Sequence, residues 1–203
     1  TQRPITTTPS RHTMKKAIVH LKSVSPYSPS RYHNTDKLEK ESHDDYERRT
    51  WMHKAHYDHK TREIFIPAMS FANSIKDAAQ YSSIKVKGKG NATWTKHFDA
   101  GVMVVNPLPL PVTIDNVEHE WLYLNADGKR NSGTRVMRCF PLIREWEGTV
   151  EYIIVDDAID QEIFTEVLTT AGQLIGVGRF RPRNRGYYGR YQIIDLKWED
   201  YRV

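Results

Sequence analysis

Cysteine is nearly absent from this 203-residue chain, which contains a single one, Cys139. One thiol excludes an internal disulfide framework and a cysteine-based zinc site, and it favours a reducing, cytoplasmic location. Apolar runs are also short. None approaches the roughly 20 residues of a membrane-spanning helix, so no membrane partner is expected. The phosphate-binding P-loop and the nucleophile elbow of serine hydrolases are missing as well.

Acidic residues are missing from two long stretches, although the net charge of the whole chain is only +5. Residues 1–35 contain six lysines and arginines and no acid, and residues 167–194 contain five arginines and no acid. The acids are concentrated in residues 36–63 and 145–166. This segregation predicts one positively charged face, which would suit a polyanionic partner.

The hydrophobic pattern predicts one domain over residues 14–203, preceded by a flexible tail at residues 1–13. Alternating apolar residues and turn signals predict a series of strands. These strands are expected at 16–24, 63–66, 98–105, 110–114, 121–124, 133–140, 149–155 and 191–198, with a turn at Asp127–Gly128. Residues 25–60 form an insertion, in which a loop rich in proline and serine precedes a charged, mobile helical segment.

Helical periodicity predicts two helices that alternate with these strands. One covers residues 70–81, with Ser70 as its N-cap, and the other covers residues 161–175, with Asp160 as its N-cap. Strand–helix–strand units therefore occur early and late in the chain. This order predicts an α+β fold with a ferredoxin-like or RRM-like antiparallel sheet and helices on one face.

The strongest functional signal is the loop after the second helix, residues 176–190, with the sequence GVGRFRPRNRGYYGR. Glycine can expose successive backbone N–H groups to an anion, and arginine binds phosphate through two hydrogen bonds. Tyrosine rings can stack on bases. The loop is therefore predicted to bind nucleic acid through Gly176, Gly178, Arg179, Arg181, Arg183, Arg185, Gly186, Tyr187, Tyr188, Gly189 and Arg190. A solvent-exposed, solubilising hairpin loop is the competing interpretation.

A second basic segment covers residues 85–98, with the sequence KVKGKGNATWTKHF. Lys87 and Lys89 beside Trp94 would suit a groove that follows phosphates, and they would extend the contacts of the arginine-rich loop. A solvated loop between two elements explains the same residues equally well.

Three segments resemble one family. A helix that runs into G-x-G, a basic spacer, G-Y-x-G-R and a final strand is similar to the glycine-rich loop of the RAMP superfamily, the ferredoxin-like RNA-binding proteins of CRISPR systems. Residues 64–76, IFIPAMSFANSIK, are similar to the strand–Pro–Ser–helix segment of backbone subunits in CRISPR effector complexes. Ser25-Pro26 resembles the S-P-x-x-x-G opening of that group, without its usual glycine.

The resemblance implies that the arginine-rich loop and the helix around Lys76 contact an RNA backbone, and that copies assemble head-to-tail. The chain is short for such a subunit and its insertion has no counterpart, so a solitary relative from a phage or mobile element is equally open. We expect a sequence-tolerant protein that binds single-stranded RNA, or less readily DNA, without cofactor or metal. It would form a homo-oligomer or filament, and CRISPR effector subunits are further candidate partners.

Two alternatives to a binding protein are open. The first is an endoribonuclease on the same fold, with His20 or His97 as general acid or base, or with Asp36 in metal-assisted cleavage. Locally satisfied histidines and a solvated acidic face explain these residues more simply, so the sequence favours a protein without catalytic activity. The second alternative is an inhibitor that mimics a CRISPR backbone subunit and caps its assembly.

Overall fold

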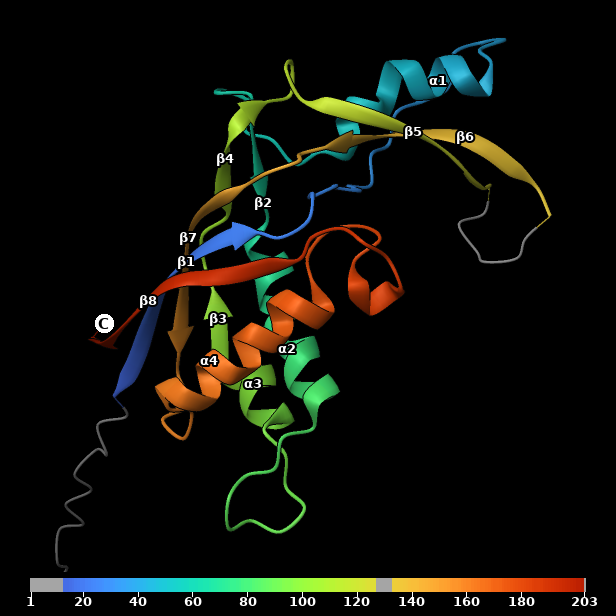
Figure 1. Ribbon diagram of the computed structural model, residues 1–203. Helices are drawn as coiled ribbons and strands as arrows, with labels where there is room; N and C mark the ends of the chain where they lie inside the picture. The colour runs from blue at the N-terminus through green and yellow to red at the C-terminus, as the bar shows by residue number, and fades with distance from the viewer. Residues whose placement is uncertain (1–12, 127–132, 203) are drawn as a thin grey trace, which may run out of the picture.

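The computed structural model describes residues 13–126 and 133–202 (Figure 1). Residues 1–12 of the predicted tail and the predicted turn at Asp127–Gly128 lie outside this part of the chain. None of the helices within it combines the length and the apolar character needed to cross a lipid bilayer.

A four-stranded antiparallel sheet with the order β3-β7-β1-β8 forms the centre of the molecule. Strand β1 (Met14–Ser23) lies between β7 (Glu147–Ile154) and β8 (Tyr191–Tyr201), and β3 (Val102–Val104) pairs with the far side of β7. Helix α2 (Ala68–Ser82) lies in the connection from β1 to β3, and helix α4 (Gln161–Thr170) lies in the connection from β7 to β8. This order and connectivity are those of the ferredoxin-like fold, so the predicted fold class is confirmed.

The two helices cover one face of the sheet because each has an apolar stripe at helical spacing. Phe164 on α4 lies edge-on to Tyr152 of β7, with ring centroids 5.3 Å apart. The side chains that meet between the helices and the sheet are buried, except Val104, which is half-buried. They are Phe71, Ile75, Phe164, Val167, Leu168 and Ala171 from the helices, and Val19, Val102, Val104, Tyr152 and Ile154 from the strands.

Two predicted elements differ from the structure. Residues 98–105 were expected to form one strand, but α3 (Thr95–Gly101) precedes the short β3. The alternation of Phe98, Ala100 and Val102 misled the prediction, because the helix buries Phe98 and Gly101, three residues apart, and leaves Ala100 exposed. Ser70 is not an N-cap, since α2 begins two residues earlier, directly after Pro67.

The end of the α4 segment also deviates from the predicted helix. Residues Ala171–Ile175 form a π turn, which adds one residue per turn and shifts the apolar stripe. Leu174, which the helical repeat placed in the core, is consequently 46% exposed.

Two further pairs of strands extend the molecule beyond the central sheet. Strand β2 (Glu63–Ile66) pairs with β4 (Leu108–Thr113), and β5 (Glu118–Asn125) pairs with β6 (Arg135–Leu142). Figure 1 shows the β5–β6 hairpin reaching away from the sheet beside helix α1 (His43–Thr50).

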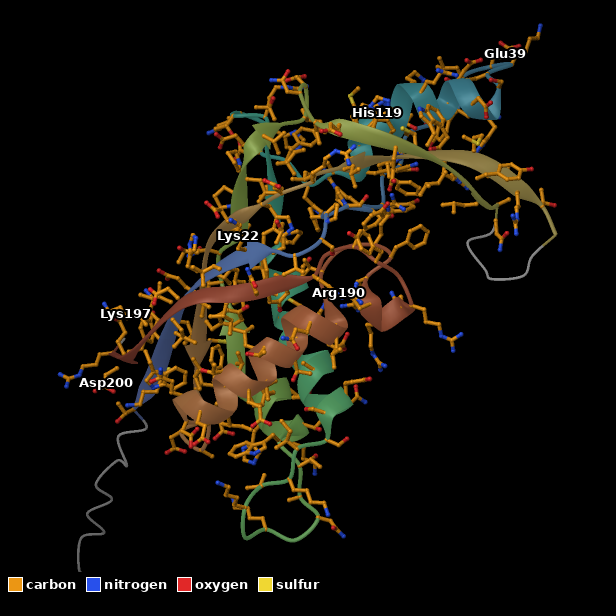
Figure 2. All side chains as sticks on the ribbon, viewed as in Figure 1. Lys22, Glu39, His119, Arg190, Lys197 and Asp200 are labelled. Atoms are coloured by element: carbon orange, nitrogen blue, oxygen red, sulfur yellow. The ribbon has the colours of Figure 1, made fainter. Side chains whose placement is uncertain are left out.

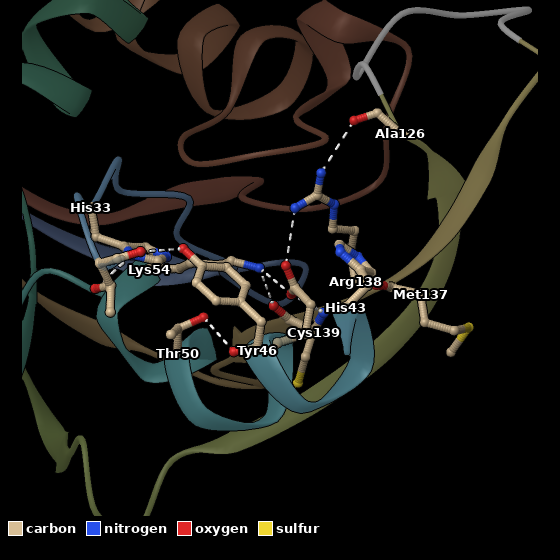
Figure 3. Close-up of polar contacts among 11 residues, drawn as sticks. His33, His43, Tyr46, Thr50, Lys54, Ala126, Met137, Arg138 and Cys139 are labelled. Carbon is tan, nitrogen blue, oxygen red and sulfur yellow. Dashed lines mark hydrogen bonds and ion pairs between the residues drawn. The ribbon is translucent and has the colours of Figure 1, made fainter. Parts of the chain in front are cut away.

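The insertion is helical, as predicted, but it is packed on the β5–β6 hairpin rather than loosely attached. Glu47 of α1 is fully buried and accepts hydrogen bonds from Lys54 Nζ at 2.5 Å, Arg138 Nη1 at 3.0 Å and the Cys139 amide at 2.9 Å. Lys54 ends the 3-10 turn Trp51–Lys54 that follows α1, and Figure 3 shows it directed at the β6 residues. Burial alone would raise the pKa of Glu47, but these donors outweigh it and lower the pKa.

Candidate nucleic-acid interface

The arginine-rich loop, residues 176–190, closes on itself and rests on the segment that follows β1. The Val177 amide donates to the Gly189 carbonyl at 3.0 Å, and the Gly189 amide donates to the Pro26 carbonyl at 2.7 Å. The Arg179 amide donates to the Ser28 carbonyl at 2.9 Å. These N–H groups were expected to face an anion. They bond within the protein instead, so they do not form the predicted concavity.

The glycines of this loop allow it to close on itself. A Cβ on Gly189, whose φ is +75°, would lie 1.8 Å from the Val177 carbonyl oxygen. A Cβ on Gly186 would lie 1.7 Å from the Phe180 carbonyl oxygen. Because a backbone atom occupies each space, these glycines allow the two arms of the loop to approach each other. The prediction that they allow a phosphate to approach is therefore not supported at these two positions.

Arg179 is held inside the protein rather than displayed on its surface. Its side chain is only 7% exposed, and its guanidinium carbon lies 3.8 Å from the centroid of the Phe140 ring. Its Nε donates to Ser28 Oγ at 2.8 Å, and its Nη2 forms an ion pair with Glu120. Its Nη1 is buried and has no hydrogen-bond partner. An unsatisfied guanidinium nitrogen is costly, and an added acceptor would remove that cost.

Glu120 joins Arg179 to Tyr188, another predicted ligand. The Tyr188 hydroxyl donates to Glu120 Oε2 at 2.8 Å. Burial and the neighbouring carboxylate raise the pKa of Tyr188 to about 12. The hydroxyl is thus engaged within the protein, while the neighbouring Tyr187 is 61% exposed.

The other arginines of the loop fall into two groups. Arg181 Nη2 forms an ion pair with Asp77 of α2 at 3.1 Å, and Arg190 Nε donates to the Gln173 carbonyl at 3.1 Å. Figure 2 shows Arg190 where the loop joins β8. Arg183 and Arg185 are exposed and form no ion pair with another described residue. Only this second pair matches the prediction of freely accessible cations.

A cleft of about 330 Å³ lies between the arginine-rich loop and the start of α2. Arg179 and Arg181 line it from the loop, and Ser70 and Asn73 line it from the first turns of the helix. The positive end of the α2 helix dipole favours an anion at this end. Two segments about 100 residues apart, both of which the sequence singled out, therefore meet in one cleft.

Ser30, from the loop after β1, and His56 also line the cleft, and sequence reasoning did not assign either to it. Burial, together with the charge of Arg31, lowers the pKa of His56, so its imidazole is neutral near pH 7. Lys76 lies one helical turn beyond Asn73 on α2. Ser25-Pro26, the third segment of the family resemblance, also lies in this neighbourhood. The segment that follows it contacts the arginine-rich loop.

The lysine-rich segment lies elsewhere. Lys87 and Lys89 are exposed in the loop that follows the C-terminal end of α2, whereas the cleft lies at the start of this 15-residue helix. A helix of that length spans about 22 Å. Trp94 is half-buried and lines a separate hollow together with Glu162 and Glu166. The structure thus does not bring this segment together with the arginine-rich loop.

The three candidate catalytic residues are not brought together either. His20 lies on β1, 3.4 Å from Thr149 Oγ1, and His97 lies on α3, with its Nδ1 2.6 Å from Asp156 Oδ2. Asp36 lies in the insertion, where its carbonyl accepts a hydrogen bond from Arg49. Across residues 13–126 and 133–202, no three His, Cys, Asp or Glu side chains cluster in a way that could hold a metal ion.

The outer face of the central sheet is the surface on which RRM domains stack bases on aromatic side chains. Here that face carries ion pairs, Lys16–Glu151 at 2.9 Å and Lys197–Glu199 at 2.7 Å. Charges that neutralise each other, from β1 to β7 and within β8, offer neither a stacking platform nor a net positive potential. The cleft is therefore the better candidate for a nucleic-acid interface.

No protein-family model matches this chain, and no curated protein matches it.

Proposed function

We propose that this protein binds a single-stranded nucleic acid, RNA in preference to DNA, and holds its sugar-phosphate backbone in the cleft. The observation that carries the proposal is the cleft itself, which Arg179 and Arg181 line opposite the first turns of α2. Arginine binds phosphate well, through directed hydrogen bonds as well as charge, and the positive end of the helix dipole favours the same anion. Arg183 and Arg185, exposed on the same loop, would attract the strand over a longer range.

The same features support a distant relationship to the RAMP superfamily. The ferredoxin-like strand order agrees with it, and the two most specific motifs of the resemblance line one cleft. We include head-to-tail assembly along the strand in this proposal. Its support is the outer edge of β8, an 11-residue strand that pairs only with β1 among the described strands. Sedimentation with and without an oligonucleotide measures this assembly.

The direct test places a negative charge in the cleft. Fluorescence anisotropy with labelled single-stranded RNA and DNA of one sequence would measure the affinity of Asn73→Asp. We expect at least about a tenfold loss for both polymers, because a carboxylate repels the phosphates. Gln80→Glu adds the same charge to an exposed position near the other end of α2 and is the matched control. Equal losses in both variants, or no binding by the wild-type protein, would contradict the proposal.

A second candidate function, metal-independent RNA cleavage, is favoured by one observation. The neutral imidazole of His56 lines the cleft and could accept the proton of a ribose 2′-hydroxyl. The same labelled RNA, analysed on a denaturing gel, would show shortened product that His56→Ala abolishes. Intact RNA after prolonged incubation would leave binding as the function.

A further inference from the structure

A second hollow of about 350 Å³ lies next to the cleft, between the loop after β1, helix α1 and strand β6. We call it the insertion pocket. Its lining includes Ser30, Arg31, Tyr32, Lys54 and Arg138. Ser30 lines both the cleft and the insertion pocket, so the two hollows adjoin at this residue. A strand that leaves the cleft past Ser30 would enter the insertion pocket.

The charges around the insertion pocket leave one cation available. Glu47 is buried beneath it and is shared by Lys54 and Arg138, which donate to its two carboxylate oxygens, so this trio keeps one net positive charge but its cations are already engaged. Arg138 also donates through Nη2 to the Ala126 carbonyl. Arg31 is exposed and forms no ion pair with a described residue, while its backbone amide donates to the Lys54 carbonyl at 2.8 Å. The backbone of Arg31 is therefore fixed and its side chain is available.

The effect of neighbouring charges on the pKa of His33 indicates a positive potential in the insertion pocket. Burial lowers the pKa of His33, and the charges of His53, Lys54 and Arg31 lower it further. Glu47 is the one neighbour that acts in the opposite direction, and it does not outweigh them. An anion would therefore be favoured at this position.

Tyr32 is the most exposed of the large apolar and aromatic side chains in the described part of the chain, at 85%. Its ring contacts no other described aromatic ring, and it directly follows Arg31. Proteins bind single-stranded nucleic acids with this combination of an exposed aromatic ring and an available cation. The cation binds the phosphate and the ring stacks on the base.

We propose that the insertion pocket is a second nucleotide subsite, in which Arg31 binds a phosphate and Tyr32 stacks on the adjoining base. It receives the part of the strand that extends beyond the cleft. This inference rests on the proposed function of the cleft, and it gives the insertion a role in setting the length of strand that one protomer covers.

Anisotropy with a series of fluorescein-labelled oligouridylates of increasing length tests this subsite. For the wild-type protein, affinity is expected to rise by roughly tenfold at the length that first reaches Tyr32, as base stacking supplies. Tyr32→Ala should remove this rise and leave the binding of shorter oligouridylates unchanged, whereas Arg31→Ala, whose charge also reaches His56 in the cleft, should weaken the longer oligouridylates more than the shorter ones. Both side chains are exposed, so thermal unfolding should confirm that the variants remain folded.

Tyr123→Ala is the control for the tyrosine, because Tyr123 is 62% exposed and lines neither hollow. The subsite is overturned if wild-type affinity shows no rise with length, if the Tyr32 and Arg31 variants keep it, or if they weaken short and long oligouridylates equally. The proposed function fails in a different way, namely when short oligouridylates do not bind the wild-type protein or when Asn73→Asp does not weaken them.

Discussion

Residues 176–190 and residues 85–93 are both basic loops that contain glycine and no acid. The lysine-rich loop is bonded mainly to itself, for example from the Val86 amide to the Ala92 carbonyl at 2.8 Å. The arginine-rich loop is bonded to residues far away in the sequence, including Ser28, Asp77 and Glu120. The comparison teaches that the number of cations does not identify a site. The partners that fix those cations, and the hollow that they line, distinguish the two loops.

The largest effect should come from a methyl group added to a glycine of each loop. Gly189→Ala should lower the free energy of unfolding by about 3 kcal/mol and abolish binding, since its Cβ would meet the Val177 carbonyl. Gly88 has the same φ of +75° but open space around it, so Gly88→Ala should cost about 1 kcal/mol. Urea denaturation measures both variants, and equal costs would contradict the view that closure of the arginine-rich loop is special.

Removal of the acid that anchors the arginine-rich loop should have the next largest effect. Glu120→Gln leaves the Arg179 side chain, which is 7% exposed, without its charged partner, so stability should fall by about 2–3 kcal/mol. Glu118→Gln on the same strand removes an exposed ion pair with Arg144 and should cost at most about 0.5 kcal/mol. Denaturant midpoints compare the two. A similar loss in both variants would mean that Arg179 is not held by Glu120.

Two double variants, each of which removes two positive charges, compare the contributions of the two loops to binding. Arg183→Ala with Arg185→Ala should weaken binding to all sequences and flatten the plot of log affinity against log salt by roughly one unit. Lys87→Ala with Lys89→Ala removes the same charge at the other end of α2 and should change the slope less. Anisotropy titrations at several salt concentrations provide the slopes. If the two slopes change equally, overall charge rather than the arginine-rich loop determines the affinity.

The smallest effect concerns pH. The pKa of Tyr188 is raised from 10.0 to about 12, so its neutral hydroxyl stabilises the loop fully below pH 10. That contribution should be lost as pH rises through 12. The difference in melting temperature between the wild-type protein and Tyr188→Phe should therefore shrink over this range. Tyr187→Phe alters the exposed neighbour, so its difference in melting temperature from the wild-type protein should stay constant over this range. If that difference shrinks as well, Tyr188 is not the source of the effect.

Much of the fold could be predicted because it depends on local periodicity. The alternation around Val19 and the helical stripe that contains Phe164 each admit one buried face, and the structure buries both residues. The prediction failed where one pattern suits two structures. Phe98 and Ala100 fit an alternating strand, yet they lie in a helix whose last residue, Gly101, packs closely on Asp156.

The candidate site could be predicted only in part. Its two main segments were identified because glycine, arginine and the Pro–Ser–helix pattern have local chemical meaning. His56 and Ser30 could not be assigned, since nothing in their own neighbourhoods indicates that they line the same cleft as Arg179. The insertion pocket was not predicted for the same reason, because the loop after β1, helix α1 and strand β6 contribute to it together.

The sequence by itself determined which segments are basic, which faces of its strands and helices are apolar, and hence the α+β class. The tertiary structure alone decided which arginines are paired and enclosed and which are exposed. Arg179 and Arg185 are six residues apart in one loop, yet only Arg179 is paired with an acid and stacked on a ring, while Arg185 is exposed. The physical reason is that an ion pair depends on distance in space, and Glu120, 59 residues away in the chain, lies beside Arg179 because strand β5 carries it there.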